Sequence, residues 1–515
     1  MANNRSFNSI RNSIYAMLGQ FVTIALNFIS RTIFIHTLGA LYLGLNGLFT
    51  NLLSVLSFAE LGFSTAVVYE MYAPLAKGDE MKVSSLMNFY AKVYRYIGIF
   101  IFVVGVVLIP YLDFFIKDPS VIPQEMPPLW IIYLLFLGNT SVSYFFNYKR
   151  SIIVASQNGY LDSLNQMKYN IVRNILQIAV LFILKSFLIF LIIQLICTLL
   201  SNISISLKAN KLFPYLNKYK DERISKDTIC SIKKNVFAMT FNKLGGVAVG
   251  GVNNLLVAKF VGLVAVGCYS NYLLVINTLR TVFIQLFTPI TASVGNFVVL
   301  KTKAESYQCY RNIMFINAYF AIIVTVCLAT LINPFIAVFW GNQYVFSTLM
   351  TLIIVLNFYV DRMRQASQMF IDVSGLFWQI KWRSACEAIS TVGLALVFLL
   401  YYNMGLMGVL LSTLIVNVFI NLWWEAYVVY KNVFKCRLWS FLIQQLVYFL
   451  ILGITYVIIE FIITKIGNDV IGLIYKTIIT FIISNSILIF FTAKTNEFKY
   501  FKSKILGYLI KNESI

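Results

Sequence analysis

Apolar segments of roughly 20 residues recur from one end of this chain to the other, with only short polar breaks between them. A helix needs about that length to cross the hydrocarbon core of a bilayer. With 59% hydrophobic and 12% charged residues among 515, the chain cannot hide its apolar surface from water in a soluble fold. The sequence therefore predicts an all-α membrane protein with about 14 transmembrane helices.

The predicted helices have boundaries that hydropathy fixes to within several residues. We expect them at roughly 12–36, 42–70, 84–110, 128–149, 160–184, 187–207, 235–258, 264–297, 308–332, 345–370, 377–402, 405–430, 439–463 and 470–492. The first segment has no small-residue cleavage pattern and is followed directly by another span, so we interpret it as an uncleaved helix.

Lysine and arginine alternate sharply between the two sides of the predicted spans. The basic positions on one side are Arg5, Arg11, Lys77, Lys82, Lys149, Arg150, 208–234, Lys301, Lys303, 362–383, 431–437 and 494–511. Because basic flanks stay in the cytoplasm, this pattern predicts a multi-pass protein of the bacterial cytoplasmic membrane with both termini inside. The net charge of +21 then reports orientation and contact with anionic membrane lipids, and no nucleic acid is expected as a partner.

Two stretches suggest an internal duplication. TLGALYLGLNGLF follows the first helix and FVGLVAVGCYSNY follows the seventh, so that Gly39 and Gly44 match Gly262 and Gly267 at one offset. We therefore expect an N-terminal lobe of six helices at 1–207, a basic cytoplasmic linker at 208–234, a second six-helix lobe at 235–430, and two further helices with a basic tail at 431–515. Many secondary transporters use such repeats for alternating access around one site.

Polar residues form stripes at steps of three and four along several predicted helices. We select as cavity-lining residues Gln20, Asn27, Asn46, Asn139, Asn170 and Asn357. Such stripes also arise from hydrogen bonds between neighbouring helices. Their number in both halves favours a hydrated cavity between the lobes, since polar groups facing lipid are costly.

Charged residues at membrane depth are the candidates for function. Arg173 and Arg280 fall nearest the midplane and are predicted to face the cavity, although ion pairing with a neighbouring carboxylate is an alternative. Arg31 and Lys243 are less deep, and long basic side chains also extend toward the interface. Glu60, Asp361 and Glu387 are candidates for proton or sodium coupling, or for structural pairing with the arginines.

The excess of cations suits a substrate carrying phosphate or diphosphate, which arginine binds through paired hydrogen bonds. Catalytic and metal-binding patterns are missing: the single histidine, His36, excludes Ser-His-Asp and histidine-based metal sites, and no D-x-D pair occurs. We expect no metal and no cofactor apart from the coupling ion, and a transporter rather than an enzyme.

The architecture, the entry RNSIYAMLGQ and the stretch LGALYLGLNGLFTNLLSVLSFAELGFSTAVV resemble the Wzx-type polysaccharide flippases of the multidrug/oligosaccharidyl-lipid/polysaccharide (MOP) exporter superfamily. The resemblance implies a flippase for undecaprenyl-diphosphate-linked oligosaccharide units in capsule, exopolysaccharide or O-antigen synthesis. It also implies head-group binding by Arg31, Lys243 and Arg280. Other polysaccharide-assembly membrane proteins would be its partners.

Three alternatives remain open at this point. A lipid II flippase shares the fourteen-helix plan. A MATE-type drug/cation antiporter has twelve spans and a more acidic cavity, so the extra helices and buried arginines count against it. A membrane polysaccharide polymerase would be expected to carry a large outer catalytic loop, and no predicted outer loop here exceeds about 20 residues.

Overall fold

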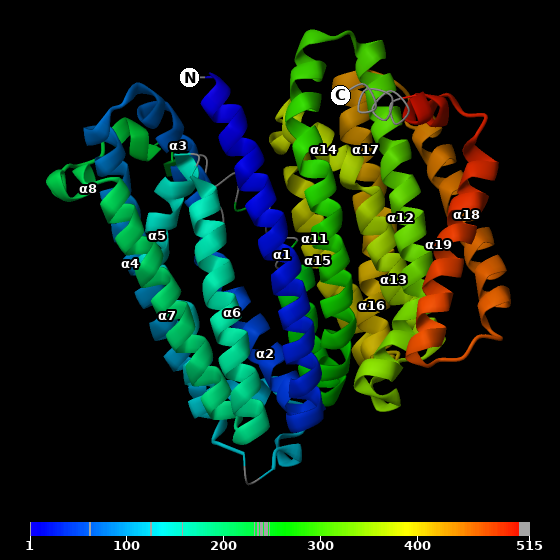
Figure 1. Cartoon of the computed structure of the whole chain (residues 1–515), viewed down its shortest axis with the longest axis horizontal. Helices are drawn as coiled ribbons and strands as arrows, with labels where there is room; N and C mark the ends of the chain where they lie inside the picture. Colours follow the sequence, from blue (N-terminus) through cyan, green and yellow to red (C-terminus); the bar gives the residue numbers. More distant parts are fainter. Residues whose placement is uncertain are drawn as a thin grey trace. The chain divides into compact units, whose positions relative to one another are not determined.

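The computed structural model describes residues 2–60, 63–123, 126–156, 158–230, 232, 233, 236, 240, 246 and 248–503. For residues 2–18 and a few others it describes the backbone only. The chain divides into two compact units, Met1–Gly267 and Cys268–Ile515, and Figure 1 shows that the described part of each is built from helices. Helices occupy the predicted spans, of which 235–258 is described only in part.

The described part of the first unit contains seven long helices and several short elements. They are α1 (Ala2–Leu38), α2 (Ala40–Leu56), α3 (Phe63–Lys77), α4 (Glu80–Val107), α5 (Leu129–Ala155), α6 (Gly159–Ile183), α7 (Phe187–Leu212), α8 (Tyr215–Lys218) and α10 (Asn253–Phe260). In this unit α1 packs on α6, α5 packs on both α4 and α7, α7 also packs on α6, and α10 packs against α2. The trio α5, α6 and α7 is therefore one packed group, which positions the site described below.

The second unit is assembled around α12. Its helices are α11 (Leu263–Leu300, beginning in the first unit), α12 (Lys303–Trp340), α13 (Thr348–Met363), α14 (Gln365–Ser374), α15 (Phe377–Leu400), α16 (Gly405–Val416), α17 (Trp423–Val429), α18 (Trp439–Ile463) and α19 (Val470–Thr492). The two terminal helices α18 and α19 pack on α12. Tyr319 of α12 donates a hydrogen bond of 2.8 Å to Asn485 Oδ1 of α19, which ties the terminal pair to this unit.

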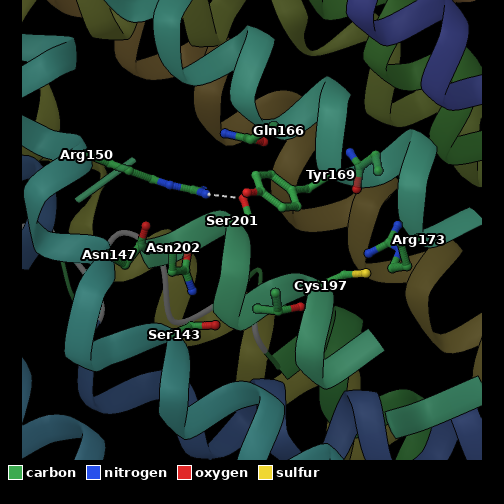
Figure 2. Close-up of a pocket in the computed structure, with 11 residues that line it drawn as sticks. Ser143, Asn147, Arg150, Gln166, Tyr169, Arg173, Cys197, Ser201 and Asn202 are labelled. Atoms are coloured by element: carbon green, nitrogen blue, oxygen red, sulfur yellow. Dashed lines mark hydrogen bonds between the residues drawn. The ribbon is translucent and has the colours of Figure 1, made fainter. Parts of the chain in front are cut away.

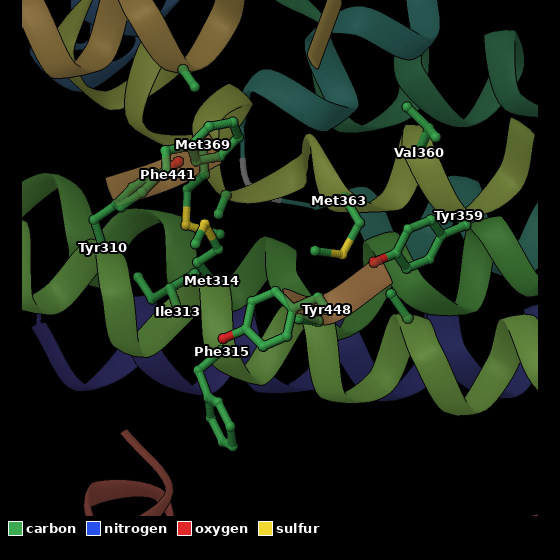
Figure 3. Close-up of a cluster of buried hydrophobic side chains, with 14 of the residues drawn as sticks. Tyr310, Ile313, Met314, Phe315, Tyr359, Val360, Met363, Met369, Phe441 and Tyr448 are labelled. Carbon is green, nitrogen blue, oxygen red and sulfur yellow. The ribbon is translucent and has the colours of Figure 1, made fainter. Parts of the chain in front are cut away.

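The core of the second unit is rich in aromatic and methionine side chains. Figure 3 shows Tyr310, Met314, Met369 and Phe441 gathered where α12, α14 and α18 meet. Tyr310 is fully buried, and its hydroxyl lies 2.8 Å from Ser367 Oγ. A polar tip with a partner and an apolar ring in the core is the arrangement that makes tyrosine suitable for such positions.

Nine of the described helices are long and apolar enough to cross a membrane. Their outward faces carry large apolar side chains, as at Phe461 and Phe490, which are about four-fifths exposed in the isolated chain. A face of this kind is stable only in contact with lipid. The chain is therefore an all-helical, multi-pass membrane protein.

Three predicted spans differ from single straight helices. The span 42–70 is broken into α2, a short 3-10 helix (Ser57–Glu60) and α3, and 345–370 divides between α13 and α14 at Arg364. The span 405–430 passes from α16 to α17 through a π-helical turn, Asn417–Leu422. Hydropathy averaged over a span does not reveal these breaks, because it follows apolarity and not backbone geometry, although polar residues such as Glu60, Arg364 and Asn417 stand at them. Local π turns frequently mark functional positions.

The glycines of the predicted duplication occupy equivalent backbone positions. Gly39 and Gly262 have φ angles of 84° and 126° and stand directly before α2 and α11. Glycine adopts a positive φ without the steric cost that a Cβ atom imposes. Their partners Gly44 and Gly267 lie in the first turns of α2 and α11, where these two helices pass very close to each other.

Candidate functional site

A polar pocket lies among α5, α6 and α7 of the first unit. Its volume is about 180 Å³. It is lined by Ser143, Asn147 and Arg150 from α5, by Gln166, Tyr169, Asn170 and Arg173 from α6, and by Cys197, Thr198, Ser201 and Asn202 from α7. Figure 2 shows these side chains converging from the three helices.

The spacing of these residues explains why they meet. On each helix they recur at steps of three or four, which places them on one face of an α-helix. The remaining faces of α5, α6 and α7 are mostly apolar. When the three helices pack together, the polar faces turn inward, because exposing them to lipid would leave their hydrogen-bonding groups without partners.

One end of the pocket is fixed by an ion pair. Arg150 Nε lies 3.2 Å from Asp162 Oδ1, and Gln166 Nε2 donates to the other carboxylate oxygen of Asp162 at 2.8 Å. Arg150 also donates through Nη2 to Ser201 Oγ at 3.3 Å. These contacts join α5, α6 and α7, and they neutralise the charge of Arg150.

The charge of Arg173 is not neutralised in the same way. It lines the pocket beside Cys197, and no carboxylate of the described residues lies within the 4 Å range of an ion pair. The pocket also contains the amide nitrogen of Asn202 and the amide oxygen of Asn147, which are buried and lack hydrogen-bond partners within the described structure. The pocket thus offers a cation, a donor and an acceptor.

The predicted cation Arg280 lies in the second unit and is paired with Asp361. Arg280 Nη2 is 3.1 Å from Asp361 Oδ2, and the carboxylate also contacts Arg362 and, at 3.9 Å, Arg364. The side chain of Arg280 is 47% exposed, whereas that of Arg362 is 2% exposed. Arg280 is therefore the accessible member of a cluster in which one carboxylate faces three guanidinium groups.

A second acidic group, on α15 and α17, is enclosed by arginines and asparagines. Arg364 forms two hydrogen bonds to Glu425, at 2.6 and 3.0 Å. Glu387 accepts from Arg383 Nη1 at 2.9 Å and from Asn421 Nδ2 at 2.7 Å. Asn421 lies in the π-helical turn between α16 and α17. The coupling candidates Asp361 and Glu387 are thus both held in ion pairs.

Glu60 has a different environment. It ends the 3-10 helix between α2 and α3, and the hydroxyl of Tyr94 from α4 donates to its carboxylate. No basic side chain in the described part of the chain lies within ion-pair distance of it. Of the three acidic candidates, Glu60 is the one whose charge has no arginine partner among these residues.

The other predicted site residues are placed as follows. Arg31, Gln20 and Asn27 are half-buried on α1, as is Asn46 on α2. Asn139 of α5 has a buried amide oxygen without a partner in the described structure. Asn357 of α13 donates to the backbone of Leu410 at 3.1 Å, which is a helix-to-helix bond. Lys243 lies outside the described residues. Of the predicted site residues that the structure describes, Arg173 and Asn170 line the pocket among α5, α6 and α7.

The sequence analysis did not identify the residues that α7 contributes to the pocket. Thr198, Ser201 and Asn202 follow one another at helical spacing in a helix that is otherwise strongly apolar. That spacing was a usable signal. The sequence analysis also did not select Asp162. Its role is to pair with Arg150, and only the packing of α5 on α6 brings the two side chains together.

No protein-family model and no curated protein matches this chain in sequence. Solved structures match it in fold. The lipid II flippase MurJ in an inward closed conformation is 16% identical, with a TM-score of 0.61 over 93% of this chain and 98% of that one.

Two MATE transporters match over a smaller share of this chain. An inward-facing MATE family transporter of the MOP superfamily is 14% identical, with a TM-score of 0.53 over 81% of this chain and 98% of that one. The Vibrio cholerae MATE transporter VcmN in its bent form is 15% identical, with a TM-score of 0.52 over 84% and 99%. The chain therefore has the helical fold of the MurJ and MATE structures.

Proposed function

We propose that this protein is a flippase that moves undecaprenyl-diphosphate-linked oligosaccharide units across the cytoplasmic membrane by alternating access, with both termini in the cytoplasm. The observation that carries the proposal is Arg173 in a polar pocket of a membrane-embedded helix group, with no carboxylate of the described residues beside it. An arginine in that position favours an anionic ligand such as a phosphate group.

The ion pairs favour an anionic substrate over a cationic drug. A drug/cation antiporter needs carboxylates that are free to bind its cation. Here Asp361, Glu387 and Glu425 are each already paired with arginine, and Asp162 is paired with Arg150. Displacing an arginine from a buried pair costs several kcal/mol, about 3–5 in comparable cases. These four carboxylates are therefore poor sites for an organic cation, and Glu60 is the acidic candidate that remains without an arginine partner among the described residues.

The extent of the fold match points in the same direction. MurJ covers 93% of this chain, whereas the two MATE structures cover 81% and 84%. A larger share of this chain therefore has a counterpart in the lipid II flippase structure than in the two MATE structures.

A lipid II flippase is the second candidate, since MurJ carries that name and matches most of the chain. The two candidates differ in the sugar that the polyprenyl diphosphate bears. The excess of cations in the first unit suits the diphosphate that both substrates contain, so the substrate must be decided by experiment.

The test is deletion of the gene followed by extraction of lipid-linked intermediates. We expect an oligosaccharide repeat unit on undecaprenyl diphosphate to accumulate, and re-expression of the wild-type chain to clear it. Accumulation of lipid II in its place would support the second candidate. Unchanged lipid intermediates, together with increased sensitivity to cationic drugs, would exclude both.

Complementation with variants connects the phenotype to the pocket. Arg173→Gln should fail to clear the intermediate. Lys168→Gln removes one positive charge from the exposed face of the same helix, outside the pocket, and should restore export. Equal complementation by both variants would contradict a role for Arg173.

A further inference from the structure

The pocket among α5, α6 and α7 has three properties that together define a ligand. It has one cation without a carboxylate partner among the described residues, it has unsatisfied hydrogen-bonding groups of both kinds, and it is small. Each property excludes a class of ligand.

The cation excludes a neutral ligand. Arg150 is compensated by Asp162 at 3.2 Å, so the pocket retains the single positive charge of Arg173. A charge surrounded by membrane-embedded helices is costly unless an opposite charge approaches it. The guanidinium offers a planar fork of donors that matches two oxygens of a phosphate or carboxylate.

The amides exclude a ligand that can only accept hydrogen bonds. Asn202 is 3% exposed, and its Nδ2 is a donor without a partner in the described structure; Asn147 Oδ1 is an acceptor without a partner there. An anion without O–H groups only accepts hydrogen bonds, so it cannot satisfy Asn147 Oδ1. A hydroxyl both donates and accepts, and a ring with several hydroxyls can satisfy both amides at once.

The size excludes a large ligand. A volume of about 180 Å³ is several times the roughly 30 Å³ of one water molecule, yet it lies below the range of about 300–1,000 Å³ that drug-sized ligands occupy. One sugar ring with its phosphate group partly outside the cavity fits this volume, and an extended oligosaccharide does not. Tyr169 adds a flat aromatic surface to the lining.

We infer that this pocket is a subsite for a glycosyl phosphate, that is, for one sugar ring and the phosphate attached to it. Arg173 binds the phosphate oxygens, and Asn147 and Asn202 bind ring hydroxyls. The inference rests on the proposed function, because there the glycosyl phosphate is the part of the lipid-linked substrate where diphosphate and first sugar join. It places recognition of that sugar inside the first unit alone.

The test measures binding of soluble probes to the purified full-length protein in detergent, by titration calorimetry in phosphate-free buffer. The probes are glucose 1-phosphate, N-acetylglucosamine 1-phosphate, the two corresponding free sugars and inorganic phosphate. We expect at least one sugar 1-phosphate to bind about tenfold more tightly than its free sugar and than phosphate, a ratio of the size that one charge-assisted hydrogen bond provides.

Three variants assign the contacts. Arg173→Gln should weaken sugar 1-phosphate binding about tenfold, while Lys168→Gln on the same helix should leave it within about twofold. Asn202→Leu should weaken sugar 1-phosphate binding but not phosphate binding. Size-exclusion profiles and unfolding temperatures of the variants establish that they are folded, and if one variant does not fold, the other still tests the site.

Several results would overturn the inference. They are equal binding of phosphate and sugar 1-phosphates, no binding of either sugar 1-phosphate, or an Arg173→Gln variant with wild-type affinity. Failure of the pocket is separable from failure of the proposed function. If the protein binds a sugar 1-phosphate but flips no lipid-linked sugar, the inferred subsite stands and the proposed flippase function is rejected. If it flips a lipid-linked sugar without binding a sugar 1-phosphate, only the inferred subsite is rejected.

Discussion

Gly44 of α2 and Gly267 of α11 face each other where the two helices cross. A Cβ atom on Gly267 would overlap the backbone oxygen of Ala40 and lie 3.2 Å from the backbone nitrogen of Gly44. A Cβ on Gly44 would in turn overlap the backbone oxygen of Leu263. The contact is reciprocal, as expected if the two stretches arose by duplication, and it allows helix backbones to meet as small residues do in membrane bundles.

Gly267→Ala is therefore expected to destabilise the protein. The obstructing atoms belong to the backbone of α2 and cannot rotate away, so the helices must separate; overpacking of this kind costs about 1–3 kcal/mol. The measurement is the thermal unfolding temperature in detergent. Gly453→Ala in α18 is the matched control, because a Cβ there meets nothing within 4 Å. An equal effect of both variants would contradict the close crossing.

Arg364 and Glu425 should behave as one coupled pair. Both side chains are at most 6% exposed, with the shortest contact at 2.6 Å. Arg364→Met leaves a buried carboxylate with reduced compensation and should cost about 3–5 kcal/mol. The double variant Arg364→Met with Glu425→Leu should recover much of that loss. A double-mutant cycle from unfolding temperatures tests this, and purely additive effects would disprove the coupling.

Arg280→Ala should abolish transport and leave the fold intact. Asp361 retains Arg362 and Arg364 as partners when Arg280 is removed, so its charge remains compensated. Asp361→Asn should instead destabilise the fold and lower the unfolding temperature, because it leaves three arginines without their shared carboxylate. Surface polysaccharide and unfolding temperature are measured for both variants. Normal export by Arg280→Ala would exclude this arginine from the substrate path.

Glu60→Gln is expected to uncouple transport from an ion gradient. Glutamine still accepts the hydrogen bond from Tyr94 but binds no proton. Proteoliposomes with the variant should flip a lipid-linked sugar to equilibrium and lose the acceleration that a proton or sodium gradient gives the wild type. Gradient stimulation that survives the substitution would leave Glu60 a structural residue.

The sequence alone was sufficient to predict the helices of this protein and several of the polar residues that face its interior. Hydropathy along the chain located the helices, nine of which, within the described residues, are long and apolar enough to cross a bilayer, because crossing depends on local length and apolarity. The polar stripes on α5 and α6 followed from helical periodicity, which is equally local. These arguments identified Arg173 and Asn170 as inward-facing before their neighbours were known.

The tertiary structure decided which polar groups meet. Arg280 and Asp361, or Arg364 and Glu425, are separated by an intervening helix or more in the chain, and their pairing depends on the rotation and depth of each packed helix. The same applies to α7. Its residues Thr198 and Asn202 become candidate binding residues only because packing places them in the same pocket as Arg173. A periodic pattern fixes the face of a helix, but only packing fixes what that face touches.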